Sequence, residues 1–346
     1  MGSDKKKMMI KLPIMRVRIK YGLAFLLLLV TLRTAAQQQV QFSQYAFNGL
    51  AVNPAYAGYK DAWYFNSIYR HQWTGFAGAP RTGGVSIDGP LQARRSSTGP
   101  GLGLQLMADI QGPQQAFSLY GSYSYRIALD EENTRRLCFG LGVGVTQYRL
   151  DGAALQYLDS EDPVFPGGGV NTISPDAQFG IYYHTPSFFL SLSVLNLLSS
   201  YTGTRYSWKG YDYSNIRKTQ HLYLATGCML PLSDHVQLKP SIMIKDDFKG
   251  PSNIDLNAML LIERVFWIGG SYRTSVPIWK NLENHLETAN AASAMVEYYI
   301  SEKFRMGYAY DLNINKLAGT QGGSHEISIG LLFLSKKYST ASPRYF

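Results

Sequence analysis

The chain has 346 residues and a formal net charge of +9, but its first 36 residues hold eight of the 33 lysines and arginines and one of the 24 acidic residues. The remainder is nearly neutral, so the high overall basicity does not support nucleic-acid binding. Charged residues make up 16% of the chain, below the ~25% typical of soluble domains, and two cysteines provide neither a disulfide framework nor a zinc cluster.

The first 36 residues are typical of a secretory signal. Basic residues from Lys5 to Lys20 precede an apolar stretch, Tyr21 to Leu32, and Thr34-Ala35-Ala36 resembles a cleavage site. The apolar stretch is shorter than the ~18 to 20 residues of a membrane-spanning helix, and no later run reaches that length. We therefore expect export from the cytoplasm, with cleavage near Ala36.

From residue 60 onward, apolar side chains occupy every second position in successive runs, separated by Gly, Pro, Asn, Asp and Ser. The opposite face of each run is mostly Gly, Ser, Thr and Tyr, where a soluble sandwich would carry many charges. The pattern predicts an all-β protein, a transmembrane antiparallel barrel of about 14 strands within a range of 12 to 16. The predicted strands lie near residues 61–72, 81–89, 101–111, 116–129, 136–149, 175–185, 188–198, 218–230, 236–246, 252–262, 265–275, 291–300, 303–313 and 324–335.

The lengths of the connections agree with this count. Numbered from the first strand, even-to-odd connections such as 185–187 are short, and odd-to-even connections such as 199–217 are long. Outer-membrane barrels have an even strand number, short periplasmic turns and longer external loops. Two connections depart from this rule: 90–100 is long and 111–115 is short. Because hydrocarbon offers no water to the backbone, such strands must close into a barrel.

Short motifs follow one another at defined places in the chain. They are Phe42-Ser43-Gln44-Tyr45, Asn53-Pro54-Ala55-Tyr56-Ala57-Gly58, Tyr69-Arg70-His71-Gln72-Trp73, Gly101-Leu102-Gly103-Leu104, Lys239-Pro240-Ser241, Ile254-Asp255-Leu256-Asn257, Gly307-Tyr308-Ala309-Tyr310-Asp311 and Ser324-His325-Glu326-Ile327. In order and spacing they resemble the PorP/SprF family, outer-membrane proteins of the type IX secretion and gliding machinery of Bacteroidetes. The resemblance runs from residue 42 to the end of the chain.

The resemblance implies a non-enzymatic role in the outer membrane. It implies binding or anchoring of a secreted protein or surface adhesin with a C-terminal sorting domain, and contact with the periplasmic ring of the secretion system and with outer-membrane lipid. The alternative is a passive transporter or channel for a small apolar or sugar-like substrate, which the same barrel would support because a fold does not fix a function.

The residues themselves offer no catalytic site. No Gly-x-Ser-x-Gly motif is present, and Ser324, His325 and Glu326 are neighbours on one predicted strand, so adjacent side chains point to opposite faces. The acidic residues of 159–162 match no EF-hand spacing. We predict no enzyme activity, no cofactor and no metal site.

Aromatic residues mark a candidate partner site. The predicted loop 199–217 contains Tyr201, Tyr206, Trp208, Tyr211 and Tyr213. Aromatic rings among Gly, Ser and Asn are typical of binding loops. An aromatic girdle at the headgroup level, or a loop folded into the lumen, fits the same composition. Trp279, in the connection 276–290, is a second candidate.

Two further segments lie at the ends of the predicted barrel. The stretch 37–60 is not strand-like and contains the candidate residues Phe42, Tyr45, Phe47, Asn53, Pro54 and Tyr56. We expect it either to plug the lumen or to contact the periplasmic ring. Arg70, Gln72 and Trp73 are expected to alternate inward and outward on the first strand. The basic tail 336–346 ends in Phe346 and is expected either to guide membrane insertion or to contact periplasmic partners.

Overall fold

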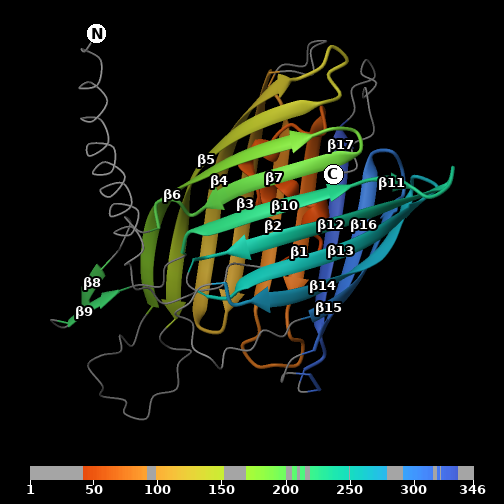
Figure 1. The fold of residues 1–346 in the computed structure, drawn as a ribbon. Helices are drawn as coiled ribbons and strands as arrows, with labels where there is room; N and C mark the ends of the chain where they lie inside the picture. Colours follow the sequence, from red (N-terminus) through yellow and green to blue (C-terminus); the bar gives the residue numbers. More distant parts are fainter. Residues whose placement is uncertain are drawn as a thin grey trace, which may run out of the picture. The chain divides into compact units, whose positions relative to one another are not determined.

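The part of the chain that the structure describes folds into a barrel of fourteen antiparallel β-strands (Figure 1). The computed structural model describes residues 42–91, 99–151, 169–199, 205–208, 211–214, 219–248, 250–278, 291–314, 318–319 and 321–333. The barrel strands are β1 (Trp63–His71), β2 (Arg81–Pro90), β3 (Gly99–Gln111), β4 (Gln114–Ala128), β5 (Arg136–Asp151), β6 (Gly169–His184), β7 (Phe188–Leu195), β10 (His221–Cys228), β12 (Val236–Asp246), β13 (Ser252–Ile262), β14 (Phe266–Val276), β15 (Ala291–Tyr299), β16 (Phe304–Asn313) and β17 (Ser324–Phe333).

Hydrogen bonds between the first and last strands close the barrel. Each strand pairs with the next along the chain, and β17 pairs with β1. β11 (Leu230–Pro231) continues the pairing of β10 with β12. Closure leaves the described barrel strands without an open edge, which would otherwise expose unpaired backbone groups.

The predicted number of fourteen barrel strands is confirmed, with differences at some boundaries. β6 begins at Gly169 instead of residue 175, because the long strand β5 offers its backbone as a partner as far as Asp151. β1 ends at His71. The expectation that Gln72 and Trp73 belong to the first strand is therefore wrong, and Trp73 adopts a φ of 51°, which turns the chain away from the strand direction.

The predicted loop 199–217 contains a short hairpin that was not predicted from the sequence. β8 (Arg205–Trp208) pairs with β9 (Tyr211–Ser214) and with no other described strand. The register sets Tyr206 opposite Tyr213 and Trp208 opposite Tyr211.

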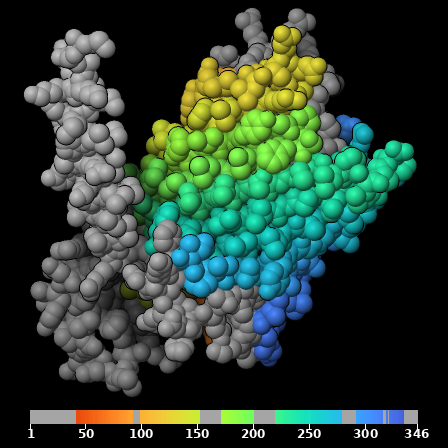
Figure 2. Space-filling view, viewed as in Figure 1, coloured from red at the N-terminus to blue at the C-terminus, as the bar shows by residue number. Residues whose placement is uncertain are grey.

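The outer face of the barrel is apolar and the inner face is polar. On β4, Leu119 and Tyr125 point outward and are 42% and 52% exposed, whereas Ser124 and Arg126 point inward and are buried. This is the inverse of a soluble β-sandwich and matches a wall that faces lipid. Figure 2 shows part of the outer face, where the side chains of strands β7 to β14 form a continuous surface.

The two ends of the barrel differ in the length of their connections. At the turn end, the chain reverses at residues 185–187, 263–265 and 300–303; at the loop end, it reverses through longer connections such as 196–220 and 277–290. The two exceptions noted in the sequence persist, since 91–98 lies at the turn end and 112–113 at the loop end.

Candidate functional site

Residues 42–59, here called the lumen segment, lie inside the barrel. They contain three short 3₁₀ turns, η1 (Tyr45–Phe47), η2 (Gly49–Ala51) and η3 (Pro54–Tyr56). Their hydrogen-bond partners lie on β2, β4, β6, β7, β13, β16 and β17, all around the wall. No helix in the described residues has the length and apolar character needed to cross a membrane.

A buried ionic cluster holds the lumen segment near the loop end. The Ser43 hydroxyl donates to Asp311 at 2.7 Å, and the backbone N–H groups of Ser43 and Gln44 donate to the Glu326 carboxylate at 2.9 and 2.7 Å. Arg70 pairs with both carboxylates, at 2.6 Å to Asp311 and 3.0 Å to Glu326. We call these five residues the loop-end lock. Charge-assisted hydrogen bonds of this kind are roughly twice as strong as neutral ones.

Substitution of Ser43 tests the loop-end lock. Ser43→Val is expected to lower the free energy of unfolding by about 1 to 3 kcal/mol, because a buried carboxylate loses its hydroxyl donor. Urea unfolding in lipid bilayers measures the change. Ser67→Val, on the outer face of β1, is the matched control and should not destabilise the barrel. Equal losses in both variants would contradict the lock.

A second buried cluster holds the middle of the lumen segment. Arg305 on β16 pairs through Nη1 with Glu297 at 2.7 Å, and its Nη2 donates to the Phe47 carbonyl at 2.8 Å and to the Asn66 side-chain oxygen at 2.9 Å. The Tyr64 hydroxyl accepts a further bond from Arg305 at 2.5 Å. One side chain thus joins strands β1, β15 and β16 to the backbone of the segment.

Asn53 and three wall glycines position the third 3₁₀ turn. Asn53 caps η3 by accepting from the Ala55 N–H at 2.8 Å, and its amide donates to the Ile181 carbonyl and to Ser191. A Cβ at Gly101, Gly140 or Gly180 would overlap the carbonyl of Ala57, the backbone of Ala55 or the side chain of Asn53, respectively. Glycine at these inward positions therefore allows the segment to lie directly against the wall.

A third ionic cluster lies at the turn end, where the segment leads into β1. Asp61 accepts from Arg126 and Arg136, both at 2.8 Å. Arg126 also donates to the Gly58 carbonyl at 2.5 Å, and the Gly58 N–H donates to Asp88 at 2.8 Å. The lumen segment therefore runs from the loop end to the turn end before β1 returns along the wall.

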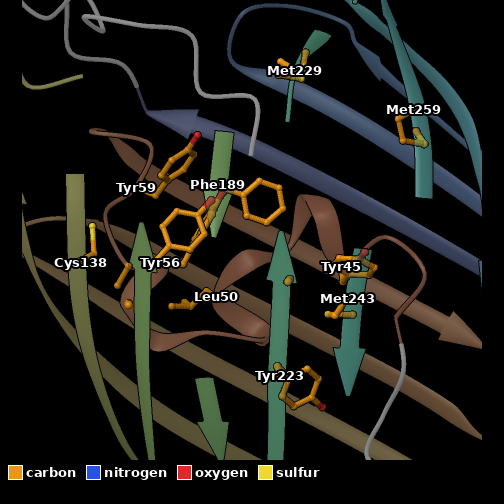
Figure 3. Close-up of a cluster of buried hydrophobic side chains, with 14 of the residues drawn as sticks. Tyr45, Leu50, Tyr56, Tyr59, Cys138, Phe189, Tyr223, Met229, Met243 and Met259 are labelled. Carbon is orange, nitrogen blue, oxygen red and sulfur yellow. The ribbon is translucent and has the colours of Figure 1, made fainter. Parts of the chain in front are cut away.

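Apolar side chains fill the space between these clusters. Figure 3 shows Tyr45, Leu50 and Tyr56 of the lumen segment against side chains of the wall, among them Met243 and Met259. Flexible methionine side chains suit such an irregular interface. A cavity of about 40 Å³ remains beside Phe42 and Tyr45, which is room for a few water molecules at most.

Cationic groups pack against the aromatic rings of the segment. The Lys239 ammonium lies 5.4 Å from the Phe47 ring centre and 5.6 Å from that of Trp267, which are cation–π distances. Burial, together with the nearby positive charges of Arg305 and Lys239, lowers the pKa of Lys60 to about 7. Burial also raises the pKa of the Tyr45 hydroxyl, which stays neutral while it bonds to Asn257.

The structure brings together many of the residues that the sequence singled out. The N-terminal candidates Phe42, Tyr45, Phe47, Asn53, Pro54 and Tyr56 all belong to the lumen segment. Arg70 belongs to the loop-end lock. Tyr206, Trp208, Tyr211 and Tyr213 lie on the hairpin, at a different place in the chain. Tyr201, Trp279, the leader 1–36 and the tail 336–346 lie outside the described residues.

Four charged residues that bind the segment were not predicted as binding groups from the sequence: Asp311, Glu326, Arg305 and Glu297. The sequence does contain a signal for these four residues. Each is a charged residue at an inward position of a strand, in a chain that has few charges. Inward charges in a barrel wall need partners, and the lumen segment supplies backbone N–H groups and a carbonyl.

Comparison with known proteins gives a family and a fold. A family model described as "Type IX secretion system membrane protein PorP/SprF" matches residues 34–331. No curated protein matches. Among solved structures, the CymD monoaromatic hydrocarbon channel is similar at 13% identity and a TM-score of 0.50, over 83% of this chain and 92% of that one. The Ralstonia pickettii toluene transporter TbuX is similar at 9% identity and a TM-score of 0.49, over 83% and 93%. At these identities the similarity concerns the fold alone.

Proposed function

Since this chain belongs to the PorP/SprF family of type IX secretion system membrane proteins, we propose that it is a non-enzymatic outer-membrane component that binds or anchors a secreted protein or surface adhesin and links it to the periplasmic secretion ring. The expected cargo carries a C-terminal sorting domain. In this role the barrel is a membrane anchor, and its ends are the binding surfaces.

The packed lumen is the observation that carries this proposal. Residues 42–59 fill the interior from the loop end to the turn end and are held by three ionic clusters, two of them fully buried. A barrel that works as a porin needs a water-filled path, whereas an anchor needs rigidity. The packing therefore favours binding at the surface over the alternative of a passive channel for a small substrate.

The loop end is the proposed surface for cargo. Outer-membrane barrels present their longer connections to the outside, and the hairpin β8–β9 lies in the longest of them, 196–220. The hairpin pairs Tyr206 with Tyr213 and Trp208 with Tyr211, and aromatic residues are enriched at the centre of protein interfaces. The turn end, where Asp61, Arg126 and Arg136 meet, then faces the periplasmic ring.

A pull-down from native outer membranes tests the proposal. The tagged protein is extracted in mild detergent, and co-purifying proteins are identified by mass spectrometry. Recovery of ring components, or of a protein with a C-terminal sorting domain, is the expected result. A barrel that is recovered alone and conducts ions would contradict anchoring.

Replacement of the hairpin aromatics locates the cargo surface. The variant Tyr206→Ser/Trp208→Ser/Tyr211→Ser/Tyr213→Ser is expected to lose cargo in the pull-down, because single interface anchors of this type contribute about 2 kcal/mol or more each. The control Tyr123→Ser/Tyr125→Ser changes two outward tyrosines of β4, near the turn end. Unchanged cargo recovery with the hairpin variant would remove the hairpin from the site.

A further inference from the structure

The outer face of β1 to β6 carries a hollow near the loop end that the proposed function does not use. Its volume is about 580 Å³. Adjacent outward positions at its centre hold the small residues Gly83 and Ala108, flanked in the same row by Tyr69 and Phe117. The next row toward the turn end is Ser67, Val85, Leu106, Leu119 and Val145. The hollow is thus a lipid-facing groove with apolar rims, and we call it the wall groove.

The next row toward the loop end is polar apart from Ile110. The strand registers align His71, Arg81, Ile110, Gln115, Arg149 and Asn171. Arg81 and Arg149 are exposed, and neither forms an ion pair within the described residues. Asp151, the next outward residue of β5, offsets one of their two charges. This side of the barrel therefore presents unpaired positive charge at the loop end.

The opposite side of the barrel lacks such a row. There, the registers align Ile244, Ile254 and Thr274 in one row and Ser252 with Val276 in the next, and neither row holds a lysine or an arginine. A general headgroup belt would be polar all around the barrel. The basic row is therefore a local feature that coincides with the wall groove.

We propose that the wall groove and the row above it bind a phosphorylated glycolipid of the outer leaflet, with an acyl chain in the groove and its phosphate between Arg81 and Arg149. Arginine forks match phosphate oxygens, and the groove lining matches an acyl chain. Three strand spacings of ~4.8 Å separate the two arginines, a span that their two long side chains close when both guanidinium groups reach one phosphate. The loop end faces the outer leaflet because an even-stranded barrel keeps its short turns in the periplasm.

Native mass spectrometry of the detergent-solubilised protein tests this site, with monophosphoryl lipid A as the probe and phosphatidylcholine as the reference lipid. Arg81→Gln/Arg149→Gln is expected to weaken lipid A binding about 30-fold, since each basic residue near an anionic headgroup contributes about fivefold. The matched control Arg264→Gln/Lys303→Gln removes two exposed charges at the turn end and should bind as the wild type does.

A second variant tests the groove independently of the charges. Gly83→Leu fills its floor, and the Cβ meets only a Tyr69 ring carbon at 3.8 Å, so the strand accommodates it. This variant is expected to weaken lipid A binding. In electrophoresis of unboiled samples it should migrate as a folded barrel, as the wild type does. Equal binding of lipid A and phosphatidylcholine by the wild type would overturn the proposal. So would loss of a co-purifying protein partner from these variants with lipid A binding unchanged.

Discussion

Gly180→Val is expected to displace the lumen segment and expose the interior of the barrel. The valine side chain would occupy the position of the Asn53 side chain, and overpacking of this kind costs about 3 kcal/mol. A cost of this size makes the population of molecules with a displaced lumen segment ~100-fold larger than in the wild type. Cys138 reports it, because its thiol faces the lumen beneath the segment and is 2% exposed.

The measurement is the rate at which a water-soluble maleimide modifies Cys138 in a Cys228→Ser background, which leaves one cysteine in the chain. Alkylation from a rarely populated open state follows its population, so the rate should rise about 100-fold. Gly121→Val is the control, since a Cβ there meets no atom closer than 4.0 Å. Slow alkylation in both variants would show that the segment does not depend on the wall glycines.

Arg305→Met is expected to be the most destabilising single change in the lumen. It leaves the buried Glu297 carboxylate without its cation and removes the donor to the Phe47 carbonyl. Breaking one partner of a buried ion pair typically costs about 3 to 5 kcal/mol. Urea unfolding in lipid bilayers measures the change in the free energy of unfolding. The control is Arg264→Met, which changes an exposed turn residue and should stay within about 0.5 kcal/mol of the wild type.

The double variant Arg305→Met/Glu297→Met tests whether the loss of stability comes from leaving Glu297 without its ion-pair partner. Removing both charges avoids the unpaired carboxylate, so the double variant should be more stable than Arg305→Met alone. A double variant that is less stable than Arg305→Met would contradict the view that the unpaired Glu297 carboxylate causes the loss of stability.

The sequence predicted the barrel because its signals are local. Alternation along each strand and the lengths of the connections depend on neighbouring residues, and both survive in the structure from β1 to β17. Strand ends were less well predicted. Gly169 belongs to β6 only because β5 extends opposite it. Pairing between residues far apart in the chain cannot be read from the sequence of one strand.

The contacts of the lumen segment could not be predicted, because they join residues far apart in the chain. Ser43 and Glu326 are bonded across 283 positions. The motifs that suggested the family lie mostly at this interface: Phe42-Ser43-Gln44-Tyr45 meets Arg70, Asp311 and Glu326. The sequence thus marked the residues of the interface without showing that they contact one another.

Single-channel recording in planar bilayers tests most directly the claim that the protein is a closed anchor. The wild-type barrel is expected to give a flat, non-conducting baseline, whereas Gly180→Val, with its displaced segment, should show open-channel steps. Stable conductance of the wild type at the level of Gly180→Val would contradict a packed lumen and would favour a channel.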